Sequence, residues 1–89
     1  FNGQVIAESD ETVVVEGNHY FPPQTVKSEF FSDPTGKSTH CPWKGDASYR
    51  DVVVNGETAS NAAWFYAAPK EKAAEIEDHV AFYSAVTVS

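Results

Sequence analysis

The chain has 89 residues, of which 42% are hydrophobic, and its thirteen acidic and six basic residues give a net charge of −7. Nucleic-acid binding requires the opposite charge balance or a basic patch, so we expect no nucleic acid as a partner. A single cysteine allows no internal disulfide, and no apolar run is long enough to span a bilayer. We therefore expect one domain over residues 1–89, located in the cytoplasm and without a membrane partner.

The first quarter of the chain is expected to form three short strands. Residues 1–7 alternate in character and predict an edge strand. The β-branched run at residues 12–15 predicts a second strand. Gly17-Asn18 supplies a tight turn into a third strand at residues 19–21.

The segment after Pro22-Pro23 is ambiguous. Residues 24–31 fit both a helical turn and a strand, and a turn leading into a strand is favoured. The composition of residues 32–38 predicts an exposed loop, because Asp, Pro, Gly and Ser cluster there.

The second half of the chain carries the clearest signals. Residues 47–54 predict the strongest strand, and Asn55-Gly56 predicts a type I′ hairpin turn, since both of its central positions need positive φ. Pro69 predicts the start of a short helix with Ala73 and Ile76 on its buried side. The remaining strands are expected at 57–60, 80–83 and 86–88. About eight short strands and one short helix predict an all-β fold, an antiparallel sandwich or open barrel.

Several segments together resemble the small bacterial domain-of-unknown-function family 427. The most specific is Thr39-His40-Cys41-Pro42-Trp43-Lys44-Gly45-Asp46-Ala47-Ser48-Tyr49, followed by Ala62-Ala63-Trp64-Phe65-Tyr66 and Val80-Ala81-Phe82-Tyr83. Glu16-Gly17-Asn18-His19-Tyr20-Phe21-Pro22 is similar to the short cyanobacterial members.

The resemblance implies a compact fold of two small antiparallel sheets, similar to the β-tent. A nucleotidyltransferase label attached to the family is not expected to apply, because the chain has no Gly-Ser with paired aspartates for a metal–nucleotide complex. Ala67 departs from the family's usual proline.

Polar chemistry concentrates in the segment 40–49, where Pro42 and Gly45 predict a rigid loop. His40 is expected to serve there as an acid–base or anion-binding group, or as a structural histidine. Lys44 is expected either to hold an anion as a point charge or to pair with Asp46 in solvent.

Basic residues are scarce in the middle of the chain. Lys37, Lys44 and Arg50 are the only ones there, enough to attract one small anion but not a polynucleotide.

Large rings supply the other half of the predicted site. Tyr49, Trp64 and Tyr66 are expected either to line an aromatic cleft or to pack in the core. A few polar groups beside aromatic walls are typical of a ligand cleft. The sequence therefore predicts that His40 or Lys44 lies in a small cavity whose wall includes Trp64 or Tyr66.

Three functions remain open from the sequence. The first is a binding module for a small ligand, anionic in one version, or for a peptide. The second is an enzyme with His40 as acid–base and Lys44 stabilising negative charge. The third is a protein-interaction domain that uses a sheet edge and has no pocket.

Metal and thiol chemistry are not expected. One cysteine and three separated histidines lack paired ligand spacing, so we predict no bound zinc and no other cofactor. Cys41 is expected to be a buried structural residue, with ligand contact or a nucleophilic role as the alternatives.

Overall fold

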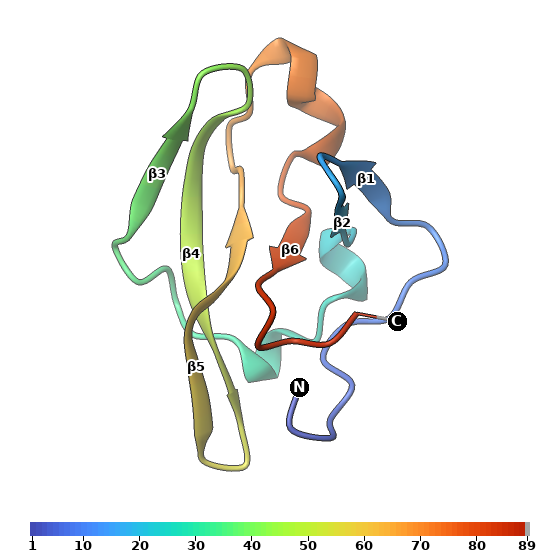
Figure 1. Cartoon of the computed structure of the whole chain (residues 1–89), viewed down its shortest axis with the longest axis vertical. Helices are drawn as coiled ribbons and strands as arrows, with labels where there is room; N and C mark the ends of the chain where they lie inside the picture. The colour runs from blue at the N-terminus through green and yellow to red at the C-terminus, as the bar shows by residue number, and fades with distance from the viewer. Residues whose placement is uncertain (89) are drawn as a thin grey trace.

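The computed structural model describes residues 1–88 and shows two antiparallel sheets, which confirms the predicted all-β class (Figure 1). The smaller sheet pairs two strands, β1 (Val13–Val15) and β2 (Asn18–Tyr20). The larger sheet has the order β3-β4-β5-β6, with β3 (Ser38–Cys41), β4 (Gly45–Val54), β5 (Glu57–Phe65) and β6 (Val80–Phe82). Figure 1 shows β3 at one outer edge of the molecule and the smaller sheet on the other side, beyond β6.

Three short 3₁₀ helices complete the fold, η1 (Pro23–Thr25), η2 (Ser28–Phe30) and η3 (Glu71–Ile76). The short helix predicted to start at Pro69 is present as η3 but begins two residues later, at Glu71, and Ala73 and Ile76 are its buried residues. None of the helices within residues 1–88 is long and apolar enough to cross a membrane.

The expectation of a turn leading into a strand over residues 24–31 was wrong. The region forms η1 and η2 instead, and its only pairing with the larger sheet is an isolated bridge between Phe31 and Val52. Pro23 occupies the first position of η1, where its fixed φ suits a helical turn and its missing N–H leaves no donor unsatisfied. The hydroxyl of Thr25 donates to the carbonyl of Pro22 (2.7 Å) and closes that turn.

Two hairpin turns depend on positive φ. Asn55 (φ 50°) and Gly56 (φ 82°) form the predicted two-residue turn between β4 and β5. The turn between β1 and β2 has Glu16 (φ 52°) and Gly17 (φ 79°) at its centre, one residue earlier than the sequence predicted.

The predicted strands at both ends of the chain were wrong. Residues 1–7 begin with a turn, since Asn2 and Gly3 have positive φ, and only Ala7 makes a bridge, to Val26. Residues 86–88 are not paired as a strand, although Val86 is buried. The described chain therefore contains six named strands rather than about eight.

Two clusters of buried residues lie on opposite faces of the larger sheet. The Tyr20 core contains Tyr20, Ala47, Tyr49, Tyr66, Ala73, Ile76 and Ala81. The Val52 core contains Ile6, Val52, Val54, Ala62, Ala63, Val80 and Val86.

Strand β4 contributes to both cores. Ala47 and Tyr49 are buried in its first half, whereas Val52 and Val54 are buried in its second half. Because side chains alternate along a strand, odd and even positions face opposite sides. The buried face of β4 therefore changes between Tyr49 and Val52, where the register with β5 shifts.

Candidate functional site

The segment 40–49 is a β-hairpin: the rigid loop expected around Pro42 and Gly45 is its turn, and the strand expected from Ala47 onward begins at Gly45. In the β3–β4 register His40 lies opposite Asp46, and Cys41 lies opposite Gly45. Cross-strand partners share a face of a sheet, and neighbours along a strand do not. His40 and Cys41 therefore point to opposite sides of the hairpin.

His40 lies on the solvent side of this hairpin. Its Nδ1 atom lies 2.8 Å from Oδ1 of Asp46, and the side chains are 61% and 74% exposed. His40 lines neither of the two cavities described below.

Cys41 is half-buried and packs against the Tyr20 core as a free thiol. Within residues 1–88, no three His, Cys, Asp or Glu residues gather in a way that would hold a metal ion. The absence of bound zinc stays a prediction, to be checked by metal analysis of the purified protein.

Lys44 is buried, which places it differently from both sequence expectations. Its Nζ atom donates to Oε1 of Glu16 (2.5 Å) and not to Asp46, and the Lys44 side chain is 9% exposed. The same Nζ atom lies 5.5 Å from the ring centroids of Trp43 and Tyr66. Lys44 thus joins the β3–β4 turn to the β1–β2 turn.

The environment of Lys44 favours its charged form. Burial alone would lower the pKa of Lys44, but the hydrogen bond to Glu16 and the nearby hydroxyl groups of Tyr20 and Tyr66 outweigh it. The pKa of Lys44 is therefore raised above its ordinary value.

The three predicted aromatic residues belong to one ring-rich face. Tyr49 and Tyr66 are buried in the Tyr20 core, and Trp64 packs against that core. Trp64 Nε1 donates to the hydroxyl of Tyr20 (3.2 Å), and the rings of Trp64 and Tyr83 lie 4.6 Å apart.

Further contacts continue this face beyond Trp64. The ring of Tyr83 stacks on Tyr49 with centroids 6.2 Å apart, and the Tyr49 hydroxyl shares a hydrogen bond with Thr39 (2.8 Å). The structure thus brings Lys44, Tyr49, Trp64 and Tyr66 to one face, with His40 on the other.

This ring-rich face predicts a loss of stability at alkaline pH. Burial raises the pKa of Tyr66, and a hydrogen bond with Tyr49 together with burial raises the pKa of Tyr83. The folded protein therefore holds protons that the unfolded chain releases above pH 10, so the free energy of unfolding falls as pH rises past that value. Urea titrations at increasing pH will measure this, and Tyr66→Phe is expected to flatten the decline. A decline unchanged in Tyr66→Phe would contradict this assignment.

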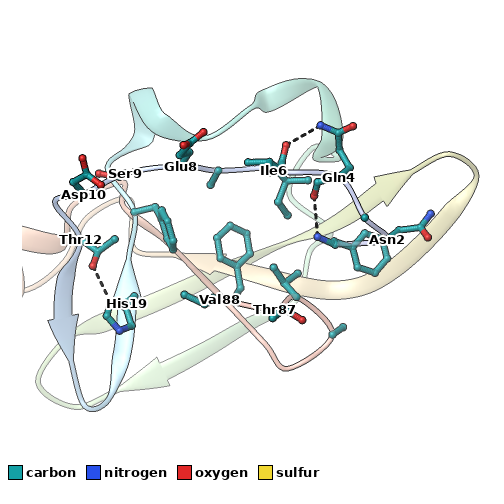
Figure 2. Close-up of a pocket in the computed structure, with 18 residues that line it drawn as sticks. Asn2, Gln4, Ile6, Glu8, Ser9, Asp10, Thr12, His19, Thr87 and Val88 are labelled. Carbon is teal, nitrogen blue, oxygen red and sulfur yellow. Dashed lines mark hydrogen bonds between the residues drawn. The ribbon is translucent and has the colours of Figure 1, made fainter.

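The larger of two described cavities has a volume of about 960 Å³ and lies between the two ends of the described chain (Figure 2). Residues 1–10 run along one side, Thr87 and Val88 along the other, and Thr12 and His19 lie at one end. Its lining residues include no Lys or Arg, and its acidic residues are Glu8 and Asp10.

The second cavity, which we call the Arg50 cavity, has a volume of about 340 Å³. Its lining comes from η1, η2 and the residues that follow them, from β4 and β5, and from β6 and the segment before it: Pro23, Val26, Ser28, Phe31, Arg50, Phe65, Asp78 and Val80. The lining is mostly apolar, with one basic and one acidic side chain. Its volume lies near the lower end of the range found for small-molecule sites in general.

Sequence reasoning identified Arg50 only as one of three basic residues in the middle of the chain. Its apolar neighbours in the cavity come from segments far apart in sequence, such as Phe31 and Val80. No local spacing connects them, so the scarcity of basic residues was the one available signal.

Comparison with curated proteins finds no match for this chain. A family model described as a domain of unknown function, DUF427, matches residues 1–89, the full length of the sequence. The match confirms the resemblance carried by the Thr39 to Tyr49 segment, and the chain belongs to the DUF427 family.

Proposed function

We propose that this protein is a binding module for a small apolar molecule that carries an anionic group, held in the Arg50 cavity. The observation that carries the proposal is a half-buried arginine that lines an apolar cavity and has no carboxylate within ion-pair distance among residues 1–88. An arginine in such a place provides both charge and a directed fork of donors.

The structure holds the Arg50 guanidinium in place but leaves donors free. Its Nη1 atom donates to the carbonyl of Ser32 (2.8 Å), and its Cζ atom lies 4.9 Å from the ring centroid of Phe65. A guanidinium has five N–H donors. The single hydrogen bond described within residues 1–88 uses one of them, which leaves a fork for a carboxylate. Fixing the side chain in advance reduces the entropy that binding costs.

The other candidate locations are less suited to an anion. Lys44 is already neutralised by Glu16, so an anion there would have to displace a bound carboxylate. An enzyme built on His40 and Lys44 needs both groups at one cleft, whereas they lie on opposite faces of the sheet. The geometry therefore favours binding at Arg50 over catalysis at the β3–β4 hairpin.

Titration with 3-phenylpropionate, followed by calorimetry and amide NMR shifts, tests the proposal. We expect binding that Arg50→Gln weakens about tenfold or more, because a charge-assisted hydrogen bond is lost. Arg50→Lys keeps the charge but loses the planar fork of donors, so its affinity for the ligand should lie between the affinities of the wild type and Arg50→Gln. Lys72→Gln removes the same charge from the exposed surface of η3 and should bind like the wild type.

Two outcomes would overturn the proposal. One is the absence of any binding by wild-type protein at millimolar ligand. The other is binding that Arg50→Gln leaves unchanged, which would place the ligand elsewhere. Thermal unfolding of each variant shows whether loss of the Ser32 hydrogen bond, rather than loss of the binding group, explains the result.

A further inference from the structure

The Arg50 cavity is lined by an acidic residue, the exposed Asp78, as well as by the half-buried Arg50. Asp78 and Arg50 both line it, yet they form no ion pair with each other. From this arrangement we infer that the ligand is a zwitterionic α-amino acid with an apolar side chain. This inference rests on the proposed function and specifies its ligand class.

The backbone around Asp78 is held from two directions. Its N–H donates to the carbonyl of Tyr66 (3.0 Å), and the preceding residue, Glu77, makes a parallel bridge with Tyr66. The N–H of His79 donates to the carbonyl of Ile76 (2.9 Å) on the other side. Asp78 itself has φ 57°, a conformation that aspartate and asparagine tolerate better than most residues. The backbone position of Asp78 is therefore set by the fold, while its side chain is exposed.

Two opposite charges that line one cavity without contact are complementary to a zwitterion. The guanidinium of Arg50 is suited to an α-carboxylate, and the carboxylate of Asp78 is suited to an α-ammonium group. If the ligand were a simple anion, Asp78 would repel it and reduce binding. A ligand with both charges would bring its ammonium group to Asp78, so that the carboxylate attracts the ligand instead of repelling it.

The rest of the lining is suited to a hydrocarbon side chain. Val26, Phe31, Phe65 and Val80 provide apolar surface beside the two charges. A volume of about 340 Å³ lies near the lower end of the range for small-molecule sites, which favours a single amino acid over a longer peptide.

The net charge of the whole protein also favours a zwitterionic ligand. A net charge of −7 repels anions at long range, whereas a zwitterion has no net charge and is not repelled. An acidic protein can therefore bind a zwitterion more readily than it can bind a plain anion.

The test compares L-phenylalanine with three analogues that each lack one feature. 3-Phenylpropionate lacks the ammonium group, phenethylamine lacks the carboxylate, and L-phenylalaninamide imitates the first residue of a peptide. We expect L-phenylalanine to bind wild-type protein about tenfold more tightly than any of the three.

Variants of the two charged residues test which group of the ligand each one binds. Asp78→Asn should reduce the affinity for L-phenylalanine about tenfold and leave 3-phenylpropionate unchanged or tighter. Arg50→Gln should weaken both ligands. Glu75→Gln, which removes an exposed acid on η3, is the matched control and should have no effect.

The outcomes separate this inference from the proposed function. If 3-phenylpropionate binds through Arg50 as tightly as L-phenylalanine, and Asp78→Asn does not distinguish them, the zwitterion inference fails and the anion-binding proposal stands. Tighter binding of L-phenylalaninamide would indicate a peptide terminus and would also overturn the inference. If no compound binds, or if Arg50→Gln leaves binding unchanged, both the zwitterion inference and the anion-binding proposal fail.

Discussion

Replacing Glu16 with alanine is expected to lower the free energy of unfolding by about 2 kcal/mol, although Glu16 is itself half exposed. The reason lies in its partner, because Lys44 is buried and Glu16 is its carboxylate partner in the described chain. Breaking a fully buried pair by removing one member costs roughly 3–5 kcal/mol, and solvent screening at Glu16 lowers that figure. Chemical denaturation of wild type and variant will measure the difference.

The same ion pair should respond unequally when its other member is replaced. Lys44→Met removes the buried charge, keeps a similar length of side chain against the rings of Trp43 and Tyr66, and leaves Glu16 in water. We expect its stability to stay within about 1 kcal/mol of wild type. Glu11→Ala, at an exposed acid in the loop before β1, controls for the change in net charge that Glu16→Ala makes. Equal losses for Glu16→Ala and Lys44→Met would show that burial of Lys44 does not determine the cost.

Replacing Tyr20 with alanine should destabilise the fold more than either change at the ion pair, by about 4 kcal/mol. Tyr20 is 0% exposed, lies at the end of β2, and packs edge-on against the Trp64 ring of β5. It therefore carries much of the contact between the smaller sheet and the larger one. A chain of 89 residues has a total stability of only about 4–13 kcal/mol, so this loss approaches complete unfolding.

Milder changes keep this prediction measurable. Tyr20→Phe retains the ring and removes only the hydroxyl that accepts from Trp64, so a loss of about 1 kcal/mol is expected. Val14→Ala, on the exposed side of the neighbouring strand, should change stability by less than about 0.5 kcal/mol. A folded Tyr20→Ala variant of nearly wild-type stability would show that the two sheets do not depend on this contact.

The sequence predicted best those features that are set by a few adjacent residues. Asn55-Gly56 specified its turn because only a few residue types tolerate positive φ at both positions. The short helix after Pro69 was found because Ala73 and Ile76 are spaced for one buried side. The strand predicted at residues 1–7 was wrong because alternation alone ignores the turn conformations available to Asn2 and Gly3.

The candidate site was harder to predict because its geometry depends on contacts between distant segments. His40 and Lys44 are four residues apart, but the hairpin between them sends their side chains to opposite faces. The partner of Lys44 is Glu16, 28 positions earlier, and no local pattern connects the two. The same holds for Arg50 and Asp78, which only the folded arrangement of β4 and the segment before β6 brings to one cavity.

The change of buried face along β4 has a consequence for cooperativity. Since Tyr49 belongs to one core and Val52 to the other, the two cores are joined by three consecutive peptide bonds rather than by a flexible connection. Unfolding of either core would disrupt the backbone hydrogen bonds that β4 makes with β5. Amide hydrogens of this strand segment should therefore exchange with solvent only through global unfolding, so that both halves of the molecule are lost in one transition.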